Sequence, residues 1–240
     1  MLLFAKGRYQ VRRAEQPAQI EAAQRLRALA FAGQAGGRDV DAYDADCDHI
    51  LVEEQDSGTL VACYRLLFIP NGTGIGRCYA AQFYDLARLQ RYDKPLLELG
   101  RFCLHPDHAD PEIVRVAWAA MTRIVDGRGV GMLFGCSSFA GCDPALHHQA
   151  LALLRARHLA PERWAPGRKA TETVDLPDAK VSAKALRQIP SLLRTYLAMG
   201  GWVSDHAVID RALNTLHVFT GVEISTIPES RKRILRATAR

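Results

Sequence analysis

One stretch of the chain, residues 94–111 (KPLLELGRFCLHPDHADP), constrains the fold and the function most strongly. Its apolar residues predict a largely buried strand, yet Glu98 and Arg101 lie inside it. A charged side chain in such a strand is costly unless it is paired or used. Two interpretations follow: either each charge finds an opposite charge in a structural network, or this strand carries an active site.

The alternation of side chains along this strand predicts which residues share a face. Glu98, Gly100 and Phe102 are expected on one face, and Leu99 and Arg101 on the other. We therefore do not expect Glu98 and Arg101 to form a simple pair along one face.

Length and composition predict a single domain. A chain of 240 residues with 48% hydrophobic residues can bury one substantial core. We expect one domain over residues 1–240, with a polar surface connection near residues 161–184 and a basic C-terminal tail at residues 231–240.

The charge of the chain favours an anionic partner. The net charge is +5 and the isoelectric point is near 9.0, which suits nucleic acid, an acidic carrier protein or an anionic membrane surface. The tail RKRILRATAR is a candidate contact for anionic lipid. No helix-turn-helix or RNA-binding signature accompanies the basic residues, so nucleic acid is not expected as a partner.

The cysteine and histidine patterns indicate a cytoplasmic protein without a metal site. None of the six cysteines forms a CxxC pair, which favours reduced thiols. The histidines lack HExxH spacing, so we predict no bound metal. The start MLLFAKGRYQ contains too few apolar residues for a signal peptide, and no apolar run is long enough to span a membrane.

The periodicity of apolar residues predicts an alternating series of strands and helices. In chain order these are a strand at 9–11, a helix at 16–31, a hairpin of strands at 49–54 and 60–69, the central strand, a helix at 111–126, a strand at 130–136, helices at 144–158 and 189–199, and a strand at 216–224. The glycine-rich run GRGVG precedes a strand, which is the reverse of the order in a dinucleotide-binding fold. A Rossmann fingerprint is therefore rejected.

This order of elements resembles the GNAT acyltransferase fold, an α/β (α+β) fold with a central mixed, twisted sheet and helices on both faces. The chain resembles more specifically the N-acyltransferases of ornithine lipid synthesis and, more distantly, the acyl-homoserine lactone synthases. The resemblance covers roughly Arg8 to Ile224. The matching pieces are RLRALAF, DVDAYD, HILVEEQDSGTLVACYRLL, LELGRFCLHP, LFGCSSFAGCDP, SLLRTYLAMGGWV and AVID. The run AFAGQAGG lacks the Trp usual after the first helix of lactone synthases, which favours the ornithine branch.

The resemblance assigns roles to charged residues that packing alone leaves unexplained. They are Arg27, Asp41, Asp44, Arg65, Glu98 and Arg101. Glu98 would be the base that takes the proton from the attacking amine, directly or through water. Glu98 and Arg101 are the predicted catalytic residues, and the other four residues are predicted to bind the amine substrate.

The acidic run at residues 39–48 has two interpretations, a solvated loop or a carboxylate cluster that holds an ammonium group. In the second, Asp41 and Asp44 bind the distal ammonium of ornithine. Arg65 or Arg101 would bind its carboxylate, for which a guanidinium fork is well suited.

The resemblance also implies where the acyl group is held. The backbone N–H of Phe102 or Cys103 is expected to donate to the developing oxyanion. The strand from Leu133 to Phe139 is expected to border the acyl tunnel.

The donor is expected to be an acyl carrier protein. Members of the GNAT fold that use coenzyme A carry a Q/RxxGxG/A loop where this chain reads HPDHADPEIVR. Without that pyrophosphate cradle, a phosphopantetheine arm on an acidic carrier protein is favoured, and no separate cofactor is expected. The complementary basic patch would include Arg115, Arg123, Arg128 and Arg155.

The resulting prediction is an acyltransferase that moves a (3-hydroxy)fatty acyl group from acyl carrier protein to the α-amine of L-ornithine. The product would be lyso-ornithine lipid, in the first step of ornithine lipid synthesis. Because that product is amphiphilic, we expect a peripheral contact with the inner face of the cytoplasmic membrane. The alternatives are a lactone synthase that uses S-adenosylmethionine, and a non-catalytic basic module that binds lipid or nucleic acid.

Overall fold

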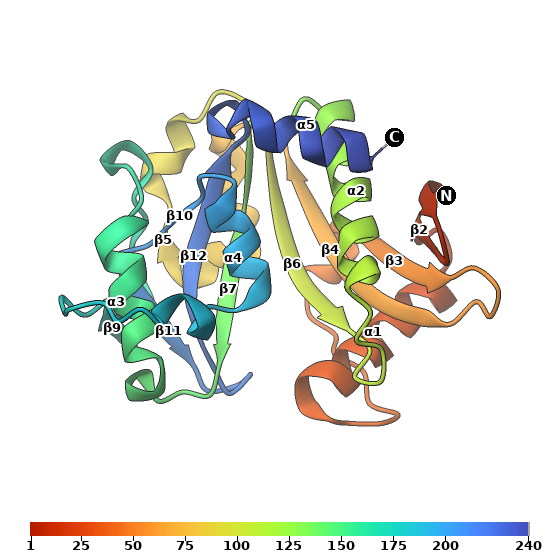
Figure 1. Cartoon of the computed structure of the whole chain (residues 1–240), viewed down its shortest axis with the longest axis horizontal. Helices are drawn as coiled ribbons and strands as arrows, with labels where there is room; N and C mark the ends of the chain where they lie inside the picture. The colour runs from red at the N-terminus through yellow and green to blue at the C-terminus, as the bar shows by residue number, and fades with distance from the viewer. Residues whose placement is uncertain (240) are drawn as a thin grey trace. The chain divides into compact units, whose positions relative to one another are not determined.

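The computed structural model describes residues 1–239, and these form two compact units (Figure 1). Unit 1 comprises residues 1–68, 99–130 and the chain from residue 229 onward. Unit 2 comprises residues 69–98 and 131–228. The strand β6 (Leu96–Leu104) begins in unit 2 and continues into unit 1. The expectation of a single domain stays a prediction.

The sheet of unit 1 contains β6 and the predicted hairpin. Its strand order is β1 (Leu2–Lys6), β2 (Tyr9–Arg13), β3 (Asp48–Glu54), β4 (Leu60–Ile69) and β6. The pairs β1–β2, β2–β3 and β3–β4 are antiparallel. Gly58, in the turn between β3 and β4, has a φ of +70°, a conformation that glycine adopts without strain.

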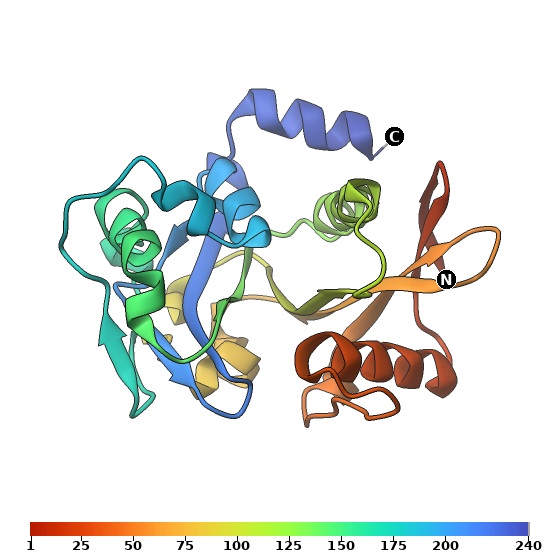
Figure 2. The same ribbon diagram turned by 60° about the horizontal axis from the view of Figure 1, so that its bottom comes forward.

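The helices of unit 1 cover both faces of its sheet. They are α1 (Pro17–Ala32), α2 (Pro111–Gly127) and α5 (Glu229–Thr238). The Cys63 thiol contacts the carbonyl of Ala23 in α1, whereas the Tyr64 hydroxyl donates to the carbonyl of Ala117 in α2. Because successive side chains of a strand point to opposite faces, α1 and α2 lie on opposite sides of β4, as Figure 2 shows.

Local sequence signals fix the ends of both long helices. In α1, Pro17 occupies the first turn, and the side-chain carbonyl of Gln19 accepts the N–H of Gln16 at 3.1 Å. Gly33 ends the helix with a φ of +65°. In α2, the Asp110 carboxylate accepts the N–H of Glu112 at 2.8 Å. The predicted helices at 16–31 and 111–126 are confirmed.

The C-terminal segment, expected as a basic tail, forms α5 over residues 229–238. Its guanidinium at Arg236 binds the Asp126 carboxylate of α2 through two hydrogen bonds of 3.0 and 3.1 Å. Arg123 of α2 donates to the carbonyl of Ala239 at 2.6 Å. These contacts dock the segment on α2; residue 240 lies outside the described residues.

Unit 2 contains the parallel strand pair of the fold. Its strand order is β6, β7 (Met132–Ala140), β12 (Thr215–Glu223), β11 (His206–Asp210) and β9 (Thr173–Asp175), with β10 (Trp202–Val203) also paired to β12. The start of β6 runs parallel to β7, with Leu96 opposite Met132. The other pairs in this sheet are antiparallel. The predicted mixed sheet with helices is confirmed.

The remaining elements of unit 2 are two helices and a small ribbon. They are α3 (His148–Arg157), α4 (Ser191–Ala198), and the paired strands β5 (Tyr84–Asp85) and β8 (Gly167–Arg168). Asp143 caps a short 3-10 helix at residues 144–147, so α3 begins four residues later than expected. Leu146, assigned by periodicity to the apolar face, is 66% exposed because that first turn is not α-helical.

Among the helices of residues 1–239, none combines the length and the apolar character that a bilayer crossing needs.

The pH dependence of stability should report on His217 of β12. This side chain is 2% exposed, its Nδ1 lies 3.1 Å from the Tyr84 hydroxyl, and burial lowers its pKa to about 4. A histidine in the unfolded chain has a pKa of about 6.5. At pH values between these two pKa values, His217 is protonated in the unfolded chain and neutral in the folded chain. The free energy of unfolding therefore falls as the pH drops through this window, with a contribution from His217 of at most about 1.4 kcal/mol per pH unit.

We expect His217→Gln to reduce this slope, measured by urea unfolding between pH 4 and pH 7. His148→Gln, a matched change at an exposed position of α3, should leave the slope as it is. Equal slopes for wild type and His217→Gln would contradict the assignment.

Candidate active site

Unit 1 gathers three arginines and three aspartates into one network of ion pairs. The arginines are Arg27 of α1, Arg65 of β4 and Arg101 of β6, and the aspartates are Asp39, Asp41 and Asp44 in the loop before β3. The network contains five of the six charged residues that the sequence singled out. Its charges balance, three against three, which is the condition for burying so many of them.

Asp44 is the centre of the network. It is 8% exposed, and its carboxylate accepts hydrogen bonds from Arg27 at 2.8 and 3.0 Å, from Arg65 at 2.7 Å and from Gln24 at 2.9 Å. Burial alone would raise the pKa of Asp44, but the bonds from Arg27, Arg65 and Gln24 hold that pKa well below its usual value. Four donors occupy its two oxygens, so Asp44 has a structural position inside the network.

Asp41 and Asp39 form the more accessible side of the network, with side chains 20% and 18% exposed. Asp41 accepts bonds from Arg65, from Arg101 at 3.1 Å and from the N–H of Tyr43 at 2.9 Å. Asp39 Oδ2 accepts Arg27 Nε at 2.8 Å and Arg101 Nε at 2.9 Å. Within residues 1–239 no hydrogen-bond donor reaches Asp39 Oδ1, which leaves this oxygen able to accept one from a ligand.

A change in backbone conformation directs Arg101 into the network. Arg101 has a φ of +53°, one of two residues other than glycine with a positive φ in residues 1–239. This left-handed conformation costs a non-glycine residue about 1 to 2 kcal/mol. The ion pairs of Arg101 with Asp39 and Asp41 offset that cost.

The same conformation breaks the alternation that the sequence predicts for β6. A Cβ at Gly100 would lie 3.5 Å from Arg65 Nε, so residues 100 and 101 both face the network. Phe102 faces the other side, where its ring stacks on Tyr64 at 5.5 Å. The expected shared face of Gly100 and Phe102 is therefore wrong, because the left-handed conformation of Arg101 interrupts the regular alternation of the strand.

Glu98 has a separate environment, in unit 2. It is 5% exposed, and its carboxylate accepts the N–H of Tyr79 at 2.9 Å and the N–H of Ala80 at 2.8 Å. Both donors belong to the short 3-10 helix η3 (Tyr79–Gln82). Two backbone dipoles thus orient the carboxylate and compensate for its burial.

Of the residues expected around the acyl group, Cys103 and Phe139 are buried and Phe102 is half-buried. Phe102 stacks on Tyr64, and the thiol of Cys103 lies 3.5 Å from the thiol of Cys63. Phe139 of β7 is 2% exposed and contacts the ring of His147. Their roles toward the oxyanion and the acyl chain stay predictions.

The four arginines expected to bind a carrier protein all have partners within the chain. Arg115 pairs with Glu112, and Arg128 pairs with Asp48 at 2.6 Å. Arg123 donates to two backbone carbonyls of unit 1, and Arg155 of α3 donates to the carbonyl of Leu176 at 3.3 Å. Three of them lie in unit 1 and Arg155 lies in unit 2, so the structure does not gather them within one unit.

One member of the network, Asp39, and two residues that contact Asp44, Gln24 and His49, were not singled out from the sequence. Asp39 lay in the acidic run without a distinguishing signal, and Gln24 was assigned to no face of α1 although it is 4% exposed. His49 of β3 is buried and its Nε2 lies 3.0 Å from the carbonyl of Asp44; burial lowers its pKa. A polar residue one turn before Arg27 on the same helix was the available signal for Gln24.

Comparison with known proteins identifies the class to which this protein belongs. Residues 8–119 match the Acetyltransferase (GNAT) domain family, and the expected fold class is confirmed. Two curated relatives are named L-ornithine N(alpha)-acyltransferase. The relative from Rhodobacter capsulatus is 34% identical over 93% of this chain and 93% of its own length, and that from Brucella abortus is 32% identical over 95% and 88%.

The chain belongs to the L-ornithine N(alpha)-acyltransferase family and is an acyltransferase. This confirms the family and the enzyme class expected from the sequence. Among solved structures, a CoA-dependent acyl-homoserine lactone synthase is similar at 15% identity with a TM-score of 0.48, over 93% of this chain and 82% of the other. A TM-score this low carries no functional argument.

Neutralising the centre of the network should destabilise the protein. Asp44→Asn leaves Arg27 and Arg65 buried with one balancing charge too few, and we expect the free energy of unfolding to fall by about 3 to 5 kcal/mol. Urea unfolding at pH 7 measures this change.

Asp46→Asn is the matched control, since Asp46 is exposed in the same loop. We expect it to change the free energy of unfolding by less than about 0.5 kcal/mol. An equally small effect of Asp44→Asn would show that the network contributes little to stability.

Proposed function

We propose that this enzyme transfers a (3-hydroxy)fatty acyl group from acyl carrier protein to the α-amine of L-ornithine, which gives lyso-ornithine lipid. The observation that carries this proposal is the 34% identity to an L-ornithine N(alpha)-acyltransferase over 93% of both chains. The charged groups of β6 and of the network in unit 1 supply the chemistry that this reaction requires.

Glu98 is the proposed base. An amine attacks a thioester only as the free base, so its ammonium form must lose a proton first. The Glu98 carboxylate, oriented by the N–H groups of Tyr79 and Ala80, would accept that proton directly or through water. Glu98 is three residues before Arg101 on the same strand, so one strand carries both predicted catalytic side chains.

The accessible side of the network is the proposed site for ornithine. Asp39 and Asp41 would hold the distal ammonium, and Asp39 Oδ1 is the oxygen best able to accept it. Arg101 is favoured over Arg65 for the substrate carboxylate, because its side chain is 11% exposed and that of Arg65 is 3% exposed. Asp44, with four internal donors, would act by holding Arg27 and Arg65 in place.

The acyl donor would be a thioester on the phosphopantetheine arm of the carrier, without a separate cofactor. The backbone N–H of Phe102 or Cys103 would donate to the oxyanion as the amine attacks the carbonyl. The carbon–nitrogen bond forms, the carbon–sulfur bond breaks, and the thiol of the arm leaves.

A peripheral membrane contact through α5 is part of the proposal. Arg231 and Arg233 are exposed on this helix, and Ile234 between them and the chain end is 58% exposed. A basic face with an apolar side chain suits an anionic lipid surface. Flotation with vesicles that contain phosphatidylglycerol should recover the protein, and a failure to float would remove the contact.

The reaction is tested by incubating the purified protein with 3-hydroxyacyl carrier protein and a panel of amine substrates, with N-acyl products identified by mass spectrometry. N-acyl-ornithine is the expected product. A product formed only from S-adenosylmethionine would establish a lactone synthase instead. No product from any amine would overturn the proposed function.

Glu98→Gln should slow acyl transfer by about 10² to 10⁴. Because an amide cannot take the proton, the remaining rate should rise with pH as the free amine becomes more abundant, while the KM for the acyl donor changes little. The measurement is kcat as a function of pH, with thermal unfolding to verify the fold. Equal kcat values for both proteins at every pH would remove Glu98 as the base.

Asp39→Asn should raise the KM for ornithine about tenfold or more, because a hydrogen bond to a charged group contributes about 1.5 to 3 kcal/mol. The KM for the acyl donor should remain near the wild-type value, which a general loss of structure would not allow. Asp46→Asn is the control from the same loop. An unchanged ornithine KM would place the ammonium elsewhere.

A further inference from the structure

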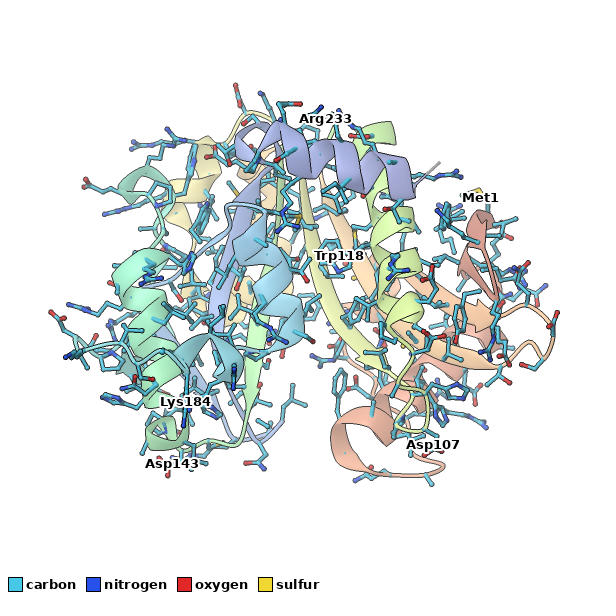
Figure 3. All side chains as sticks on the ribbon, in the orientation of Figure 1. Met1, Asp107, Trp118, Asp143, Lys184 and Arg233 are labelled. Carbon is cyan, nitrogen blue, oxygen red and sulfur yellow. The ribbon has the colours of Figure 1, made fainter. Side chains whose placement is uncertain are left out.

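A second basic surface lies in unit 2, on the stretch from Lys180 to Arg194, here called the 180–194 segment. It contains four cationic side chains, all of them exposed: Lys180, Lys184, Arg187 and Arg194. It contains no Asp or Glu. Figure 3 labels Lys184, which lies on this stretch. Within residues 1–239 none of these four side chains forms an ion pair, whereas Arg115 and Arg128 of the predicted patch do.

An apolar side chain stands among these charges. Leu186 is 55% exposed, two residues after Lys184 and directly before Arg187. It belongs to the short 3-10 helix η7 (Ala185–Gln188). A single exposed leucine is ordinary on a protein surface. Here it adds an apolar contact to a rim of unpaired cations, the composition that protein interfaces use.

The segment is held in place before any partner arrives. The side chain of Gln149 in α3 accepts the N–H of Ser182 at 2.8 Å and donates to the carbonyl of Lys180 at 3.4 Å. Ala185 and Ile189 are 0% and 2% exposed, so they attach η7 to the interior of unit 2. A surface that is already ordered loses little conformational entropy when it binds.

The segment and the candidate catalytic base belong to the same unit. The segment ends in α4, where Arg194 is exposed and Tyr196, two residues later, is 2% exposed. One face of α4 therefore belongs to the basic surface, and the other is buried in the unit that contains Glu98.

We propose that the 180–194 segment is the docking surface for the acidic carrier protein that delivers the acyl group. The proposal rests on the proposed function. Four unpaired cations complement an acidic helical surface, and Leu186 provides its apolar contact. The position of the segment beside α4 would bring the phosphopantetheine arm to the unit that holds Glu98. A carrier protein is favoured over a membrane here because the segment lies in the unit that contains Glu98, to which the acyl thioester has to be brought.

The test measures binding of a fluorescently labelled holo acyl carrier protein by anisotropy at two salt concentrations. Lys184→Glu/Arg187→Glu should weaken binding about tenfold or more and reduce its salt dependence, and Leu186→Ser should weaken it without changing the salt dependence. Arg91→Glu/Lys94→Glu is the matched control, since these two cations of unit 2 are also exposed, three residues apart and outside any ion pair within residues 1–239. Unchanged binding by the first variant, or an equal loss in the control, would overturn the inference.

A second readout separates this inference from the proposed function. The ratio of turnover on 3-hydroxyacyl carrier protein to turnover on 3-hydroxyacyl pantetheine should fall about tenfold in Lys184→Glu/Arg187→Glu. N-acyl-ornithine formation with no change in this ratio would overturn the docking surface alone. Carrier binding that depends on the segment, without any N-acyl-ornithine, would support the surface and overturn the proposed reaction. If Lys184→Glu/Arg187→Glu lost binding to phosphatidylglycerol vesicles but kept carrier binding, the segment would be reassigned to a membrane contact.

Discussion

The burial of Asp44 among Arg27, Arg65 and Gln24 is the interaction on which unit 1 depends. A carboxylate in this position has to be ionised, and each guanidinium around it has to be held, because an unpaired buried charge costs several kcal/mol. The network therefore connects a helix, a loop and two strands, and α1 also packs against these strands through a small apolar cluster. It also explains why α1 carries an arginine on its buried face, where helical periodicity alone favours a leucine.

The conformation of Arg101 shows how the fold positions a functional side chain at a cost in backbone energy. A regular strand would turn residues 100 and 101 to opposite faces, whereas the positive φ of Arg101 turns both toward Asp39 and Asp41. Glycine at position 100 fits this arrangement, since its neighbour across the sheet is the long side chain of Arg65. The strain is retained because the ion pairs of Arg101 form only in that conformation.

Much of the fold followed from the sequence because its signals are local. Capping at Asp110, Pro17 and Gly33 fixed the helices, and alternation with a glycine turn fixed the β3–β4 hairpin. Glu98, Arg65 and Arg101 were recognisable because charges inside apolar strands require an explanation, whereas Arg27, Asp41 and Asp44 followed from the family resemblance. Three features were not predictable. The partners of Asp44 depend on contacts between distant segments, the positive φ of Arg101 has no residue-type signal, and α5 is stabilised by α2 rather than by its own composition.

The balance of three positive and three negative charges in the network also has an evolutionary consequence. Replacing any one of the six residues by a neutral one leaves three charges of one sign against two of the other, so single substitutions are disfavoured relative to balanced double replacements. This coupling favours a change at two positions of opposite charge over a change at one. We therefore expect related enzymes that accept a different amine to differ first at residues around the network. The six charged residues of the network would be retained.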